Sequence, residues 1–151
     1  MRHLAHLADL AQLVGQPLAD SQWMSIEQSR IDAFAHATND HQWIHIDVDR
    51  AANGPFGTTI AHGFLTLSLL PAMLADAFHI DDVRMGVNYG LNRVRFPAPV
   101  PSGSRVRARL KLLDFQTLPE GGAQFTLEAT VEREGSDKPV CVAELVTRQH
   151  V

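Results

Sequence analysis

Cysteine is almost absent from this 151-residue chain, which contains one, Cys141. A single cysteine excludes an internal disulfide framework and fits a reducing compartment. The chain also lacks any basic run, and its net charge is -4, which argues against nucleic acid as the main partner. The first sixteen residues have no continuous apolar block, unlike a signal peptide. We therefore expect a cytoplasmic protein.

An uninterrupted apolar stretch is lacking as well. The most apolar segment, Ile60 to Phe78, contains His62, Thr66, Ser68, Pro71 and Asp76, which argues against a membrane span. A helix that is apolar on every side is buried instead. Pro71 cannot donate to the carbonyl of Leu67, so the helix should kink there or end its regular part. The segment predicts a buried core helix.

The second half of the chain has a period-two pattern. Apolar and polar residues alternate over Ser104 to Leu112 and over Ala123 to Val131, which predicts strands with one buried face. Gly121-Gly122 lies between them, so we expect an antiparallel hairpin. Its register would set a row of basic residues near Glu128 and Glu132. Further strands are expected over Tyr89 to Phe96 and Val140 to Thr147, with Pro97, Pro99 and Pro101 marking a bend.

The first half is predicted to be helical. The apolar spacing of Leu4, Leu7, Ala11 and Val14 suggests a short amphipathic helix within residues 1–16. Ser25 and Gln28 resemble a capping box at the start of a second helix, which Asn39 would end in the left-handed conformation. Asp47 resembles an N-cap for a short helix over Val48 to Asn53, followed by the loop Gly54 to Gly57.

These elements predict an α+β protein, most simply one domain over residues 1–151, with an antiparallel sheet wrapped on a long helix. A sheet that covers a single helix leaves one face exposed, and its edges need protection. Dimerisation through an edge or a face is therefore expected.

Chemistry is suggested by Asp40 and His45, which stand close together between two predicted helices. Histidine titrates near neutrality, so it can take or give a proton, and a neighbouring carboxylate can hold the same water. Gly63 begins the core helix, where a free N–H could bind a substrate oxygen. Asp40 could instead cap a loop, His45 could be a buried structural histidine, and His62-Gly63 could simply permit close packing. Spacing alone leaves these alternatives open.

A metal site is not expected. His41 and His45 are four residues apart, and Asp47 follows. That spacing puts two histidines on one face only within a helix, and no cysteine pair completes a ligand set.

The run ATNDHQWIHIDVDRAANGPFGTTIAHGFLTLSLLP and the later stretch NYGLNRVRFPAPVPSG resemble the MaoC-like (R)-specific enoyl-CoA hydratases, and specifically their nodulation protein N-like branch. The resemblance covers roughly Ser25 to Val151. It implies a hot-dog fold, a homodimer and an acyl-CoA substrate bound along the subunit interface. It also implies a hydro-lyase that needs no cofactor and adds water to a trans-2-enoyl thioester to give the (R)-3-hydroxyacyl thioester.

By position, the resemblance makes Asp40 and His45 the catalytic acid/base pair and Gly63 the donor to the thioester oxygen. Gln42 and His62 would lie beside the substrate. Many relatives read Asn-Pro where this chain has Gln42 and Trp43, and some have a serine on the central helix where this chain has Pro71. A hot-dog thioesterase and a non-catalytic acyl-CoA-binding dimer module remain the alternatives.

Overall fold

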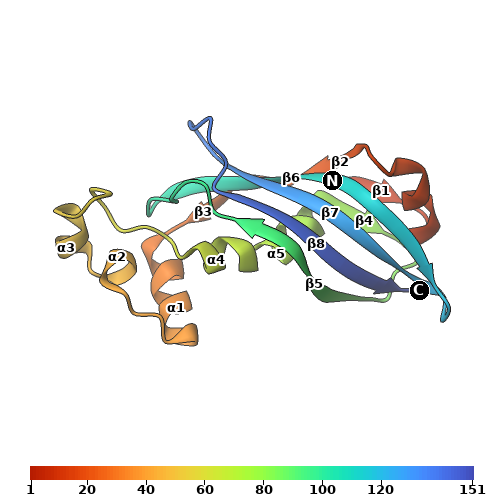
Figure 1. Ribbon diagram of the computed structural model, residues 1–151, viewed down its shortest axis with the longest axis horizontal. Coiled ribbons are helices and arrows are strands. Elements are labelled where there is room, and N and C mark those ends of the chain that lie inside the picture. Colours follow the sequence, from red (N-terminus) through yellow and green to blue (C-terminus); the bar gives the residue numbers. More distant parts are fainter.

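An antiparallel sheet of six strands forms one layer of the protein (Figure 1). The computed structural model describes all residues, 1–151. The strands are β2 (Pro17–Asp20), β3 (Met24–Ile26), β5 (Met85–Arg95), β6 (Ser104–Leu118), β7 (Gly122–Arg133) and β8 (Cys141–His150). Their order is β2-β6-β7-β8-β5, and β3 also pairs with β6. β5 therefore lies at an edge of the sheet.

The hairpin of β6 and β7 has the expected register. Gly121 adopts a positive φ of 87° in its turn, a conformation that glycine takes without strain. Across the hairpin Arg107 is the partner of Glu132 and Lys111 is the partner of Glu128, and Arg107 forms an ion pair with Glu132. The predicted row of opposite charges is confirmed.

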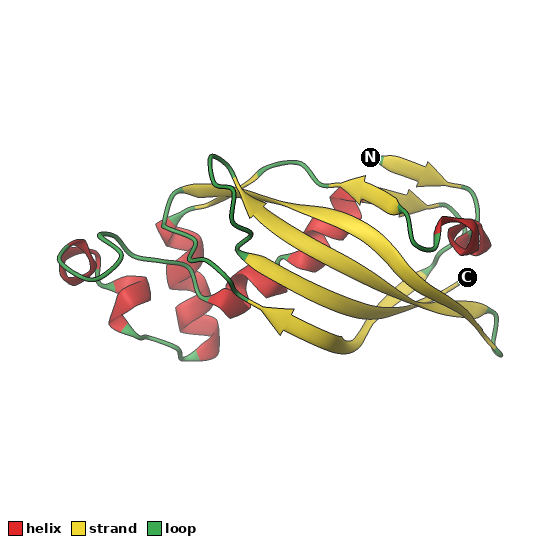
Figure 2. Ribbon diagram, turned by 45° about the horizontal axis from the view of Figure 1, so that its top comes forward, coloured by secondary structure: helices red, strands yellow, loops and turns green.

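The core lies between the sheet and two consecutive helices, α4 (Gly63–Ser68) and α5 (Leu70–Ala77). Figure 2 shows these helices running across one face of the sheet. The alternating apolar side chains of β6 and β7 are buried against them, and Leu70 and Met73 are fully buried on the helical side. None of the helices combines the length and the apolar character that a membrane span requires.

The single long helix predicted over Ile60 to Phe78 is wrong in its bounds. The helical segment begins only at Gly63, is interrupted at Leu69 and ends at Ala77. Pro71 lies in the first turn of α5, where a missing N–H costs no intrahelical bond, so the expected break is confirmed. The helix is not buried on all sides, because Phe64 is 66% exposed.

The N-terminal helix predicted within residues 1–16 is present only in part and is a 3₁₀ helix. Residues Arg2–Leu4 form β1, which pairs in parallel with β4 (Phe78–Ile80). Residues Leu7–Leu13 form a 3₁₀ helix. Its buried side chains, Leu7 and Leu10, are three residues apart, and this spacing aligns side chains in a helix of three residues per turn.

A helical lobe extends from one end of the sheet (Figure 1) and consists of α1 (Gln28–Thr38), α2 (Trp43–Ile46) and α3 (Val48–Ala52). The predicted capping box is wrong, because Ser25 lies in β3 and Glu27 is the N-cap of α1. Asn39 ends α1 with φ 59°, as predicted. Asp47 is the N-cap of α3, and its carboxylate accepts from the backbone N–H of Arg50 at 3.0 Å, also as predicted.

Candidate active site

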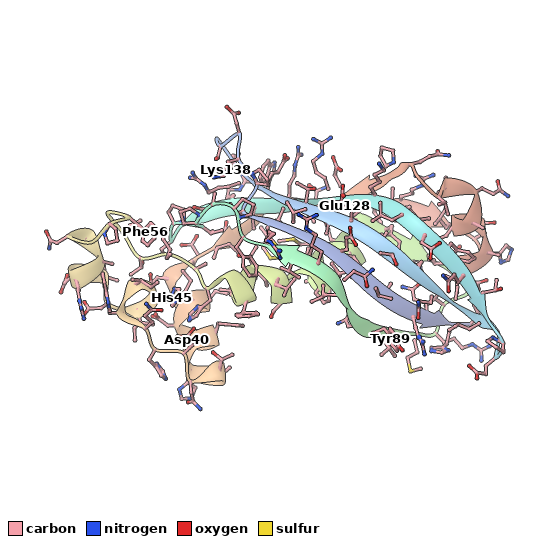
Figure 3. The ribbon with its side chains drawn as sticks, in the orientation of Figure 1. Asp40, His45, Phe56, Tyr89, Glu128 and Lys138 are labelled. Carbon is pink, nitrogen blue, oxygen red and sulfur yellow. The ribbon has the colours of Figure 1, made fainter.

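The candidate site lies where the helical lobe meets the start of α4. Asp40 follows the left-handed turn that ends α1, His45 lies on α2, and His62 and Gly63 begin α4. Figure 3 places Asp40 and His45 near each other in the lobe. One oxygen of Asp40 and one ring nitrogen each of His45 and His62 lie within 4.8 Å of one another. The fold thus brings together the acid and the histidine that the sequence singled out.

His45 is held in one tautomer. Its ring is buried, with the residue 6% exposed, and Nδ1 lies 2.7 Å from the carbonyl oxygen of Ile60. A carbonyl oxygen only accepts hydrogen bonds, so Nδ1 must carry the proton and Nε2 presents its lone pair. Burial is the main cause that lowers the pKa of His45 below 6.5, and the charge of His62 acts in the same direction. The backbone bond and Asp40 oppose this shift. Neutral His45 is therefore equipped to accept a proton.

Asp40 is the accessible member of the site. Its side chain is 51% exposed, and the backbone N–H of Gln42 approaches its Oδ1 at 3.4 Å. The charge of Asp40 favours protonated His45, as a carboxylate close to an imidazole does. Gln42, which the sequence placed beside the substrate, meets Asp40 through its main chain in this structure.

His62 lies between the other two residues and is only 2% exposed. Its Nε2 is 3.0 Å from the main-chain oxygen of Asp40. Its ring stacks on that of His45, with the centroids 3.8 Å apart and the planes at 24°. Phe34 packs on His62 as well, at 4.9 Å between centroids. The Nδ1 atom of His62 is buried and has no hydrogen-bond partner.

Gly63 borders a hollow of about 320 Å³ that His45 also lines. The other walls are mainly apolar and come from Phe56, Ile60, Phe96 and the segment Pro97 to Val100. The ring of Phe96 covers the Cα of Gly63 so closely that a Cβ there would lie 2.9 Å from two ring carbons. The hollow joins His45 to an apolar surface, which suits a substrate with a polar reactive end and a hydrocarbon part.

Sequence reasoning missed the role of Gln28. Its Nε2 donates to the main-chain oxygen of His45 at 2.7 Å and to Asp32 at 2.9 Å. Its Oε1 accepts from the hydroxyl of Thr59 at 2.5 Å. Gln28 therefore ties α1 to α2 and to the loop before α4. No local pattern marks these contacts, because they join segments 17 and 31 residues away along the chain.

Asp40, His45 and His62 are close enough to raise the question of a metal ion. The lone pair of an imidazole nitrogen lies in the plane of its ring, so two stacked rings cannot both point a lone pair at one ion. In addition, Nδ1 of His45 and Nε2 of His62 are used by backbone carbonyls. The set of His41, His45 and Asp47 considered from the sequence does not form a metal site either, because the carboxylate of Asp47 caps α3. The donor set fits a water or a substrate oxygen better than a metal.

An antiparallel sheet wrapped on a central helical segment defines the hot-dog fold, and the site adds an acid, a neutral histidine and a helix start. The model of the family described as "MaoC like domain" matches residues 9–134. The chain therefore belongs to the MaoC-like dehydratase family, and the predicted class of enzyme, a hydro-lyase, is confirmed.

Two curated relatives match nearly the whole chain. The chain is 53% identical over 148 residues to 3-hydroxyacyl-thioester dehydratase Z of Mycobacterium tuberculosis, covering 98% of both chains. It is 48% identical over 147 residues to nodulation protein N of Rhizobium leguminosarum bv. viciae, covering 96% of this chain and 91% of the relative. Among solved structures, the R-hydratase PhaJ1 of Pseudomonas aeruginosa has a TM-score of 0.72 and 26% identity, covering 91% of this chain and 81% of that one. The resemblance found in the sequence and the predicted fold are confirmed.

Proposed function

We propose that this protein interconverts (R)-3-hydroxyacyl and trans-2-enoyl thioesters, with acyl-CoA as the thioester, through Asp40 and His45. The observation that carries the proposal is the fixed tautomer of His45. Its Nδ1–H is bound by Ile60, so Nε2 keeps its lone pair, and one ring nitrogen of His45 lies within 4.8 Å of a carboxylate oxygen of Asp40. A neutral imidazole with a lowered pKa is in the correct form to accept a proton at neutral pH. The names of the relatives, a 3-hydroxyacyl-thioester dehydratase and an R-hydratase, support this reaction class.

In the hydration direction, Asp40 and His45 hold one water against C3 of the enoyl group. The pair removes one proton as the water oxygen forms its bond to C3. The electrons of the double bond move toward C2 and the thioester oxygen, and the pair then returns a proton to C2. The atoms of one water are added across the double bond, and no electron acceptor or cofactor is required.

Gly63 is proposed to stabilise the charge that develops on the thioester oxygen. The N–H groups of the first turn of a helix have no intrahelical acceptor, and Gly63 is the first residue of α4. A donor placed where charge develops lowers the barrier more than one that binds the substrate and the transition state equally. The apolar hollow beside Gly63 would receive the acyl chain.

A homodimer is part of the proposal. β5 has a hydrogen-bonded neighbour, β8, on one side only. It exposes the large apolar side chains of Met85, Val87, Tyr89 and Leu91, and exposed edges of this kind are normally covered. A second copy would cover this edge. Light scattering on the purified protein should give about twice the mass of the chain, and a monomer would contradict this part of the proposal.

The activity is tested with crotonyl-CoA by following loss of the absorbance of the conjugated thioester, together with a free-thiol assay. We expect loss of absorbance without release of thiol. Release of thiol would identify a thioesterase. Binding of crotonyl-CoA without turnover would identify a non-catalytic acyl-CoA-binding module.

Two variants connect the activity to the site. Asp40→Asn and His45→Asn should each lower kcat by about 10²- to 10⁴-fold, the usual contribution of a positioned acid or base. Asp49→Asn is a matched control, because Asp49 lies in the first turn of α3 and is not among the residues that group with His45. Full activity in both site variants would contradict the assigned roles.

A further inference from the structure

We infer that His62 is a positioning residue, which holds Asp40 and His45 in register without touching the substrate. The family resemblance placed His62 beside the substrate. This inference deepens the proposed function and rests on it.

The first observation is that His62 contacts both members of the pair through different parts of its ring. Nε2 binds the main-chain oxygen of Asp40 at 3.0 Å. The face of the ring lies on His45, at 3.8 Å between centroids. The carboxylate of Asp40 comes no closer than 4.0 Å to His62 Nε2. His62 therefore positions the backbone of the acid and leaves its carboxylate free.

The second observation is burial. His62 is 2% exposed, between His45 on one side and Phe34 on another. A thioester cannot reach a side chain this covered without a rearrangement of both neighbours. Asp40, with half of its side chain exposed, and the hollow beside Gly63 offer the accessible surfaces. The substrate thus meets the residues that His62 holds.

The third observation fixes the tautomer of His62. The carbonyl oxygen of Asp40 only accepts, so Nε2 of His62 must carry a proton. The proton is therefore on Nε2 in His62 and on Nδ1 in His45. Nδ1 of His62 is buried and has no partner within the protein. A buried polar atom without a partner destabilises the folded protein. A hydrophobic residue at position 62 would avoid this cost, but it could not form the hydrogen bond to the main-chain oxygen of Asp40.

The test uses two amides that differ in where they place an N–H group. In His62→Gln the amide can reach the place of Nε2, whereas in His62→Asn it reaches only the place of Nδ1. We expect His62→Asn to lower kcat on crotonyl-CoA by about 10- to 100-fold, as loss of one buried hydrogen bond that orders the site would do. KM should stay within about twofold, and His62→Gln should recover most of kcat. His36→Asn, an exposed histidine on α1, is the control for the loss of a histidine.

The split between kcat and KM, together with rescue by the conservative variant, separates positioning from the alternatives. Positioning predicts a lower kcat in His62→Asn, little change in KM, and recovery of kcat in His62→Gln, whose amide can bind the main-chain oxygen of Asp40. A raised KM with unchanged kcat would show that His62 binds substrate. Equal losses of kcat in both variants that follow their melting temperatures would show a packing role only.

A measurement on the wild-type protein needs neither a variant nor turnover. Nitrogen chemical shifts of the labelled histidines should show the proton on Nε2 in His62 and on Nδ1 in His45. The opposite tautomer in His62 would overturn the inference whatever the activity. Conversely, wild-type protein that hydrates no enoyl thioester would contradict the proposed function and leave the tautomer result intact.

Discussion

The substitution Gly63→Ala tests why a glycine begins α4. A Cβ at this position would lie 2.9 Å from Cγ and Cδ2 of Phe96 and 3.1 Å from its Cε2. Ordinary contacts between carbon atoms are about 3.5–4.0 Å, so the ring of Phe96 must move by at least ~0.5 Å. Cγ is the ring atom nearest the backbone, and a rotation of the ring about its own axis does not move it. The backbone itself does not oppose alanine, because Gly63 has no positive φ.

The expected cost follows from this overlap. Inserting a methyl group into a packed site costs about 1–3 kcal/mol. Phe96 is 40% exposed and can turn outward, so we expect the lower part of that range, about 1–2 kcal/mol. For a protein of this size the melting temperature should fall by about 2–8 °C.

A double-mutant cycle in urea is the assay. In the Phe96→Ala background the overlapping ring is absent, so Gly63→Ala should cost less than about 0.5 kcal/mol. The coupling energy between positions 63 and 96 should therefore be about 0.5–2 kcal/mol. Additive effects of the two substitutions would refute the reasoning from the contact.

The same four proteins separate the two roles of Gly63. If the glycine serves only to accommodate Phe96, activity in the double variant should equal that of Phe96→Ala. The proposed role at the thioester oxygen predicts instead that the methyl group lowers kcat in both backgrounds.

Two further predictions concern the surroundings of His45. Gln28→Ala should lower the free energy of unfolding by about 1–3 kcal/mol, because it leaves the main-chain oxygen of His45 and the hydroxyl of Thr59 without their partner; an unchanged urea midpoint would contradict this. Stability should fall as pH drops below about 6.5, since the unfolded chain binds a proton at His45 that the folded protein, with its lowered pKa, resists. His45→Gln should reduce this dependence in urea titrations at pH 7.5 and pH 5, and an equal slope in both proteins would exclude His45 as its source.

The β half of the fold was predictable because strand patterns report burial directly. Side chains of successive strand residues point to opposite faces, so alternation over Ser104 to Leu112 and Ala123 to Val131 revealed both the strands and their buried face. The hairpin then fixed the register, including the pair Arg107 and Glu132. The structure extends β6 to Leu118, where exposed polar residues weaken the pattern.

The N-terminal errors have a tertiary cause. Leu4, Leu7, Ala11 and Val14 match a helical period, yet Leu4 belongs to a strand that pairs with β4, more than seventy residues away. A pairing at that distance leaves no local signal. Ser25 resembled a helix cap for the same reason, since its pairing with Arg105 decides that it lies in a strand. Local propensity is overridden where a distant strand supplies hydrogen bonds.

The candidate site likewise has a part that the sequence could predict and a part that it could not. Asp40, His45 and Gly63 belong to one stretch, so residue types and the family resemblance could single them out. The structure places them together, and their catalytic roles stay predictions. The stacking of His62 on His45 and the cover of Phe96 over Gly63 could not be predicted, because each depends on side-chain packing between elements.

The site is fixed through the main chain. The carbonyl of Ile60 binds His45, the carbonyl of Asp40 binds His62, and the carbonyl of His45 binds Gln28. Each hydrogen bond fixes one loop segment, so removal of one leaves the other two in place. Losses of activity should therefore be graded, with Gln28 and His62 variants weakened and not inactive. The largest loss should occur at His45, because its side chain both takes part in one of the three hydrogen bonds and supplies the proposed base.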